Sequence, residues 1–244
     1  MIIGYTALHY GSPYLSYAIR SIIDAVDMYF ILYAAQPSHG TRVNGYTLPD
    51  SESRYNLYLQ ANEAAGDKLA WIDGDWTAEG VQRDSIHTIC PNAEAVLVLD
   101  YDEIWQAGVA REVIELALAG DKWGYRMNMI HYWRSFRRAV LHDPAYPVRV
   151  IVPGRTGEGY LHTAPINHMG YAIPTWLLDY KLAVHGHVGQ LRHDGWRENK
   201  WLANAQQDCH PIGSEYWNPE TIEPIDYLPS FMQNHPYWTK EIIE

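Results

Sequence analysis

The sequence predicts an α/β fold in which helices flank a mostly parallel central sheet and a mixed half follows toward the C-terminus. Short apolar runs alternate with stretches of helical spacing through the first hundred residues. Helix-length connections between consecutive strands favour parallel pairing through right-handed crossovers. Beyond Asp100 this alternation stops and strand-like runs become more frequent. A chain of 244 residues is long enough to bury one sizeable core.

In the first half, apolar runs predict four strands, and helical spacing predicts helices between them. The strands are expected at 2–8, 28–35, 68–72 and 95–100, and the helices at 15–26, 56–67 and 77–89. The last of these strands is apolar throughout until Asp100, which is typical of a strand buried on both faces. Ligand sites of such sheets lie at the carboxyl ends of the strands, so the residues that follow each strand are the first candidates for a site.

In the second half the pattern is mixed. It predicts strands at 124–133, 146–154 and 180–189, and helices at 108–119 and 195–207. Five prolines from Pro211 onward interrupt regular structure, so the last segment is expected to wrap the surface as an irregular tail anchored by Trp217, Tyr227 and Trp238. We therefore expect three parts, at 1–105, 106–210 and 211–244, of which the first two form one domain.

The charge and the aromatic content narrow the classes of function. Asp and Glu number 29 against 18 Lys and Arg, and the net charge of −11 opposes binding modes that need broad neutralisation of phosphates or anionic lipid. With 10 Trp and 19 Tyr against 3 Phe, nearly every ring carries a polar group suited to a half-wet cleft. The chain has two cysteines, too few for a disulfide framework, and neither a leader segment nor an apolar run of membrane-spanning length. A cytoplasmic protein without a membrane span is expected.

The sharpest chemical signal is the pair Asp100 and Asp102, which follows the apolar run 95–99. Strand alternation places both carboxylates on one side. Two carboxylates at the end of a buried strand repel each other and lose hydration, so a cation is expected there, and oxygen ligands favour Mg²⁺ or Mn²⁺. A second pair, Asp73 and Asp75 in WIDGDW, ends the preceding strand, but its glycine is typical of a tight turn. Asp100 and Asp102 are therefore the predicted metal ligands.

These residues resemble the nucleotide-sugar half of family 2-type glycosyltransferases, which have the Rossmann-like GT-A fold. The resemblance covers roughly residues 1–105, and it is carried by Arg83 in QRDSIHTI and by the strand-end motif VLVLDYDE at 96–103. It implies that Asp100 and Asp102 bind a metal ion and the diphosphate of the donor, and that Arg83 orients the nucleotide. It also implies nucleotide contacts at the end of the first strand, at Tyr5, Thr6 and Ala7.

One departure from the family pattern and two matches to it complete the implied donor site. The family often has an acidic residue near the base at the end of the second strand, where this chain has AAQPSHG, so Asp73 is the expected substitute. Members of the family also have a late H-x-G segment followed by a basic helix. His187 in HGHVG (185–189) matches that segment and is the implied third metal ligand, and Lys200 is the implied diphosphate contact.

A transfer that inverts the anomeric centre needs a general base to deprotonate the acceptor hydroxyl. The resembled subgroup often has a His-Glu pair after the middle strands, but this chain has His162 followed by Thr163. Asp179 in WLLDYK and His162 are therefore the candidate bases. Neither a P-loop nor a G-x-G-x-x-G motif occurs, which disfavours ATP and NAD as ligands.

The leading hypothesis is a metal-dependent glycosyltransferase that uses Mn²⁺ or Mg²⁺. It would move a sugar from a nucleotide-diphosphate sugar to the hydroxyl of a glycan or small-molecule acceptor, with inversion. One alternative keeps the fold and glycosylates a hydroxymethylated base in DNA, and it needs WRSFRR (133–138) and the region Arg192–Lys200 to form one basic groove. The others are a non-catalytic carbohydrate-binding protein and a metal-dependent phosphoesterase.

Overall fold

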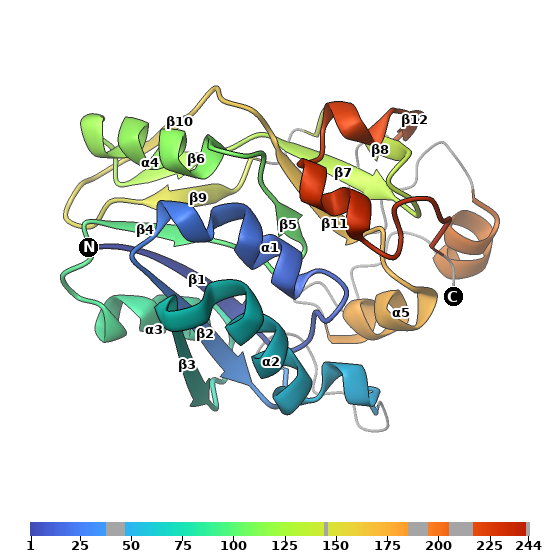
Figure 1. Ribbon diagram of the computed structural model, residues 1–244, viewed down its shortest axis with the longest axis horizontal. Helices are drawn as coiled ribbons and strands as arrows, with labels where there is room; N and C mark the ends of the chain where they lie inside the picture. The colour runs from blue at the N-terminus through green and yellow to red at the C-terminus, as the bar shows by residue number, and fades with distance from the viewer. Residues whose placement is uncertain (38–46, 144–145, 185–194, 205–216, 243–244) are drawn as a thin grey trace.

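The computed structural model describes residues 1–37, 47–143, 146–184, 195–204 and 217–242, which form two sheets with helices packed against them (Figure 1). The first sheet has the strand order β10-β6-β9-β4-β1-β2-β3. Its strands are β1 Ile2–Leu8, β2 Met28–Ala34, β3 Leu69–Gly74, β4 Ala95–Val98, β6 Gly124–Arg126, β9 Val148–Ile151 and β10 Glu158–Tyr160. Strands β3, β2, β1 and β4 pair in parallel, and within the described strands of this sheet only β9 runs against its neighbours.

Side-chain alternation along the central strands gives this sheet two apolar faces. One face packs Tyr29, Ile31 and Leu97 together with three helices, α1 Leu15–Ile22, α2 Arg54–Ala65 and α4 Val109–Ala119. The opposite face packs Tyr5, Phe30 and Val98 with Ile86 of helix α3 Glu79–Ile89. The central strands are therefore buried on both sides, which leaves their ends as the places where polar side chains can gather.

The second sheet has the order β12-β8-β7-β11-β5. Its strands are β5 Glu103–Ile104, β7 Met129–Trp133, β8 Arg138–Val140, β11 Ile166–Tyr171 and β12 Glu220–Thr221. Strand β5 comes directly after the segment Asp100–Asp102, so the chain leaves the first sheet at the end of β4 and enters the second sheet here. The two aspartates lie at this crossing.

The predicted fold class is confirmed: a mostly parallel central sheet is flanked by helices, and a mixed sheet follows. The four strands and three helices expected in the first half all form, with ends within a few residues of the expected ones. Among the helices of the described ranges, none combines the length and the apolar character needed to cross a membrane.

Two expected strands are wrong in the second half. The run 124–133 forms two strands, β6 and β7, which belong to different sheets. Residues 180–184 belong to helix α5 Thr175–Val184, because Leu177, Leu178 and Val184 are buried at helical spacing directly after Pro174. Residues 185–189 lie outside the described ranges. Of the helix expected at 195–207, the described part contains one π-type segment, Arg197–Leu202.

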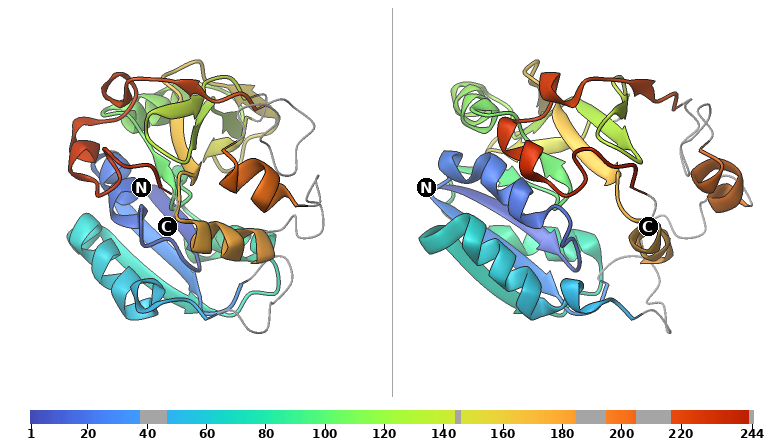
Figure 2. Two further views of the ribbon diagram at one scale, coloured as in Figure 1. Left: turned by 90° about the vertical axis from the view of Figure 1, so that its right-hand side faces the viewer. Right: turned by 45° about the vertical axis from the view of Figure 1, so that its right-hand side comes forward.

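The described tail residues 217–242 run over the second sheet and reach helix α1 (Figures 1 and 2). They contain β12 and two 3₁₀ turns, Pro224–Asp226 and Ser230–Asn234. Trp217 is buried, Tyr227 and Trp238 are partly buried against the core, and the amide of Ile242 donates to the carbonyl of Arg134 at 2.6 Å. The tail thus ties the second sheet to the helices of the first.

His235 fixes this tail to the start of the chain. Its ring stacks on Tyr14 with the centroids 4.9 Å apart, and its Nε2 donates to the carbonyl of Pro13 at 2.8 Å. Nδ1 accepts from the amide of Tyr237 at 3.1 Å. Both ring nitrogens are engaged in the neutral form, so protonation of Nδ1 removes an acceptor.

Acidification from pH 7 to pH 4 is expected to lower the free energy of unfolding by about 2–3 kcal/mol through His235. Burial lowers the pKa of His235 to about 4, although the Pro13 carbonyl opposes this shift. An unfolded histidine titrates near pH 6.5, so between about pH 4 and 6.5 the unfolded state binds more protons, and the stability present above pH 6.5 falls with the pH. Urea unfolding of the chain and of His235→Gln at several pH values measures this effect. If the free energy of unfolding changed with pH by the same amount in both proteins, this role of His235 would be contradicted.

Candidate active site

A cavity of about 190 Å³ opens at the carboxyl ends of β1 and β4, where the chain crosses to the second sheet. Its walls come from the end of β1, helix α3, the crossing segment, β11 and α5. The charged and imidazole groups that line it include Glu79, Arg83, Asp100, Asp102, His168 and Lys181. Small-molecule sites usually measure roughly 300–1,000 Å³. The described walls therefore enclose space for one part of a larger ligand.

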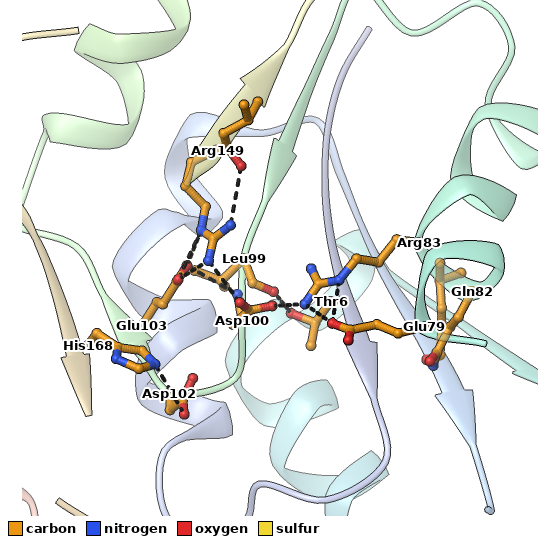
Figure 3. Close-up of polar contacts among 12 residues, drawn as sticks. Thr6, Glu79, Gln82, Arg83, Leu99, Asp100, Asp102, Glu103, Arg149 and His168 are labelled. Carbon is orange, nitrogen blue, oxygen red and sulfur yellow. Dashed lines mark hydrogen bonds and ion pairs between the residues drawn. The ribbon is translucent and has the colours of Figure 1, made fainter. Parts of the chain in front are cut away.

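Asp100 is held by two guanidinium groups that approach from opposite sides (Figure 3). Nη2 of Arg83 donates to Oδ1 at 2.7 Å, and Nη2 of Arg149 donates to Oδ2 at 2.8 Å. Burial alone would raise the pKa of Asp100, but Arg83 and Arg149 outweigh burial and hold the pKa far below its usual value. Asp100 is thus an ionised carboxylate with both oxygens engaged.

Arg149 also forms an ion pair with Glu103, whose side chain is fully buried (Figure 3). Nε of Arg149 lies 2.9 Å from each Glu103 oxygen, and Nη2 lies 2.5 Å from Oε1. Burial raises the pKa of Glu103 to about 7, because Arg149 offsets only part of the loss of hydration and Asp100 adds repulsion. One arginine therefore serves two carboxylates.

Asp102 is held differently, by an ammonium group. Nζ of Lys181 lies 3.1 Å from Oδ2 of Asp102, and Nε2 of His168 lies 3.6 Å from the same oxygen. Asp102 is 2% exposed. Burial opposes ionisation, yet the Lys181 ammonium, with a contribution from His168 in its protonated form, lowers the pKa of Asp102. Its carboxylate is therefore ionised beside the cavity.

A line of side chains behind the cavity sets the tautomer of His168. Nδ1 of His168 lies 2.8 Å from Nδ1 of His131, and Nε2 of His131 lies 3.4 Å from Oδ2 of Asp143. Because Asp143 favours a proton on Nε2 of His131, we assign Nδ1 of His131 as the acceptor from His168. Burial lowers the pKa of His168. In this tautomer, Nε2 of neutral His168 presents its lone pair beside Asp102.

The cluster has a surplus of negative charge. Four carboxylates face three permanent cations in two sets of ion pairs: Arg83 and Arg149 pair with Glu79, Asp100 and Glu103, and Lys181 pairs with Asp102. Burial strengthens such interactions because the local dielectric constant is low. Where Glu103 is ionised, above its pKa of about 7, the carboxylates outnumber these cations, and a further positive charge at this edge of the sheet is favoured.

The cavity residues fit a divalent ion in part. Among the described residues, no three His, Cys, Asp or Glu side chains gather as a metal site. Magnesium sites, however, often use one or two carboxylates and take their other ligands from substrate phosphates and water. An oxygen of Asp102 and Nε2 of His168 suit such a partial site, whereas both oxygens of Asp100 accept from arginines. The implied third ligand, His187, lies outside the described residues.

The residues expected to contact the nucleotide divide into two groups. Ala7, Arg83 and Asp100 line the cavity. Thr6 is fully buried, and its hydroxyl donates to the carbonyl of Leu99 at 2.7 Å. Tyr5 is buried on the face of the sheet that helix α3 covers. Thr6 therefore fixes the strand end from which Ala7 borders the cavity.

Four other predicted residues are not among the described residues that line this cavity. Asp73, at the end of β3, accepts from Nε and Nη2 of Arg54, each at 2.6 Å. Asp179 on α5 accepts from Nε of Arg197 at 2.9 Å, and the ring of His162 stacks on Tyr160 with the centroids 5.5 Å apart. Lys200 lies in the segment Arg197–Leu202. The structure does not bring these side chains to the two aspartates.

Three side chains that contact Asp100 or Asp102 are not among the predicted site residues. Arg149 is a lone charge inside the apolar run 146–154, and a buried charge of this kind indicates a partner. Lys181 falls in the run 180–189, which is predicted as a strand, whereas residues 180–184 form part of helix α5. His168 lies on β11, far from the aspartates in sequence with β6 to β10 between, and the antiparallel pairing of β11 with β5 brings it opposite Glu103.

Comparison with known proteins gives a partial similarity to solved structures. No protein-family model matches the chain, and no curated protein matches it. Among solved structures, it is similar to the galactosyltransferase LgtC in complex with donor and acceptor sugar analogues, with 16% identity and a TM-score of 0.33. The match covers 52% of this chain and 46% of that chain, so this chain spans less than half of the neighbour's length. The function is therefore argued from the site itself.

Proposed function

We propose that the chain transfers a sugar from a nucleoside-diphosphate sugar to an acceptor hydroxyl, and that the cavity at Asp100 and Asp102 binds the diphosphate and the sugar. The observation that carries the proposal is the pair of ionised aspartates at the carboxyl end of β4, in a cavity that Arg83 and Lys181 also line. Carboxylates and fixed cations at the carboxyl ends of parallel strands are suited to a phosphorylated ligand. The cavity encloses one part of such a donor.

The roles of the residues follow from their contacts. Arg83 and Arg149 keep Asp100 ionised and rigid, so that its position at the strand end is fixed before a ligand arrives. Asp102, with His168 and the diphosphate oxygens, would hold Mn²⁺ or Mg²⁺. When bound, such an ion supplies positive charge to the leaving diphosphate. Lys181, which also lines the cavity, adds a second positive charge on the same side.

The acceptor hydroxyl must lose its proton during the transfer. An inverting transfer requires a general base, and Asp179 and His162 stay the predicted candidates. Asp179 is paired with Arg197, and His162 stacks on Tyr160, so each would have to reach the acceptor from outside the described cavity walls. Tyr10 and Tyr171 line the cavity, and both are buried, so they contribute to its walls.

The DNA alternative depends on a basic groove that the described residues do not favour. Within the run 133–138, Arg134 pairs with Glu241 at 2.8 Å and Arg137 pairs with Glu223 at 3.3 Å. Arg192, which the groove also needs, lies outside the described residues. Acidic partners thus neutralise two of the cations that would have to contact phosphates.

Binding of a nucleoside diphosphate is expected to raise the melting temperature by about 5–10 °C at a ligand concentration near 100 times Kd, a stabilisation of about 2.7 kcal/mol. Thermal shift with UDP, GDP, ADP and CDP, each with and without Mn²⁺, measures it. A free glycan that stabilises the chain when all four nucleotides fail would replace the proposal with the carbohydrate-binding alternative. Loss of the nucleotide effect in Asp102→Asn would connect it to this cavity.

A further inference from the structure

We propose that Lys181 is an internal counter-ion of Asp102. Its ammonium group occupies a cation position beside that carboxylate, and it moves to the diphosphate when donor and divalent ion bind. The inference deepens the proposed function and rests on it for the identity of the donor. It assigns a role to Lys181, and it predicts that the divalent ion and the nucleotide bind cooperatively.

The position of Lys181 is the first observation. Its Nζ lies 3.1 Å from Oδ2 of Asp102 and 3.3 Å from the carbonyl oxygen of Gly170, and 5.8 Å from the ring centroid of Tyr171. The side chain of Lys181 is 13% exposed, that of Asp102 is 3% exposed, and both border the cavity. The ammonium group and the carboxylate that it pairs with therefore both face the space that a ligand would fill.

The contrast between the two aspartates is the second observation. Asp100 is gripped by guanidinium groups from two different elements, α3 and β9, with one bond to each carboxylate oxygen. Asp102 has only the ammonium of Lys181 as a permanently charged partner among the described ion pairs. An ammonium is a compact point charge on a flexible four-carbon stem, whereas guanidinium groups fix a carboxylate geometrically. Asp102 is therefore the carboxylate whose partner can be exchanged.

Space around Lys181 is the third observation. A Cβ on Gly170 would lie 2.8 Å from Nζ of Lys181, and 2.3 Å from Cε1 of His168. The absence of a side chain at this position leaves room for both groups beside Asp102. Because Lys181 lines the cavity, its Nζ can turn toward a ligand without displacing side chains of the core.

These observations imply coupling between the two ligands. If Mn²⁺ binds at Asp102 without a diphosphate, Lys181 is left with an uncharged carbonyl and a ring as its partners. If a diphosphate is present, its oxygens give the ammonium a new anionic partner. The cost of releasing Lys181 is thus removed by the second ligand, and coupling of this kind usually changes affinity by about 5–150-fold.

The test measures Mn²⁺ affinity of the full chain in the absence of any nucleotide, by electron paramagnetic resonance of free Mn²⁺. Lys181→Met, which keeps the length of the side chain and removes its charge, should bind Mn²⁺ more tightly by about 5–150-fold. Lys181→Arg should bind it no more tightly than the unchanged chain does. Lys122→Met removes a surface charge paired with Asp121 and should leave the affinity unchanged.

The outcomes separate the inference from the proposed function. Equal or weaker Mn²⁺ affinity in Lys181→Met, or no detectable binding in any variant, would overturn the inference. Lys181→Gln provides a second neutral variant if the methionine variant does not fold. UDP affinity with chelator present is the second arm, and Lys181→Met should weaken it. Tighter Mn²⁺ binding in the neutral variants, together with no binding of any nucleotide, would preserve the counter-ion and reject the glycosyltransferase.

Discussion

Replacement of Arg149 by methionine is expected to lower the free energy of unfolding by about 3–5 kcal/mol, which is the usual cost of removing one partner from a buried ion pair. Arg149 is 9% exposed and is the described cation that contacts both Glu103 and Asp100. Without it, Glu103 would be a fully buried carboxylate that must either remain charged without a counter-ion or take up a proton. Urea unfolding at pH 7 measures the change.

The size of this loss should increase with pH. The pKa of Glu103 is about 7 even beside Arg149, and loss of the arginine would raise it further. A folded-state pKa above the unfolded value of roughly 4.3 means that the folded state binds more protons, so stability is lost as the pH rises through that range. Arg149→Met should therefore be less destabilised at pH 5.5 than at pH 8. A pH-independent loss would contradict this account.

Two variants serve as controls for Arg149. The double variant Arg149→Met with Glu103→Gln removes the unpaired charge and should recover part of the stability. Arg126→Met breaks the exposed pair with Glu158, whose side chains are 38% and 43% exposed, and should cost about 0–1 kcal/mol. An equal loss in Arg126→Met and Arg149→Met would show that burial of the pair is not the cause.

Replacement of Asp102 by asparagine is expected to lower the rate of sugar transfer by about 10²–10³-fold, the usual effect of removing one preorganised electrostatic group from an active site. Asparagine has nearly the same shape, so the fold should persist, while Lys181 and His168 lose the charge that they face. The measurement is transfer, or donor hydrolysis, with the nucleotide sugar selected by the thermal-shift screen. Activity that is unchanged in Asp102→Asn would reject the cavity as the active site.

Asp179→Asn and His162→Asn are the matched comparisons, because both residues are predicted bases that lie outside the described cavity walls. If neither is catalytic, each variant should retain about the activity of the unchanged chain. A loss in Asp179→Asn as large as that in Asp102→Asn would restore Asp179 as the base. It would also mean that the acceptor binds beside Arg197, the partner of Asp179.

The first half of the fold could be predicted because its strands are apolar on both faces and each is separated from the next by helical spacing. The run 95–100 is an example, since it is short, contains Val96 and Val98, and follows Pro91, and these features favour a strand over a buried helix. Lys181 shows why the second half was harder to predict. The segment 180–184 is short and apolar, and for such a segment the spacing of hydrophobic residues does not separate a strand from a buried helix.

The candidate site was predictable only where its residues are close in sequence. Asp100, Asp102 and Arg83 follow from a strand end and the helix before it, and the structure joins Arg83 to Asp100. Arg149 reaches the same carboxylate because β9 pairs antiparallel with β4, a pairing that local sequence does not encode. Burial of long-range charge pairs is a property of tertiary packing, so Arg149 emerges only from the folded chain.

The position of His235 affects how the protein is made. All strands of the first sheet lie before residue 161, so a growing chain can complete this sheet long before its tail exists. Tyr14 and Tyr17 on α1 are covered by the rings of His235 and Phe231, which leave the ribosome about 4–15 s later at ordinary rates of synthesis. During that interval the rings of Tyr14 and Tyr17 lack the cover that the tail gives them in the folded chain.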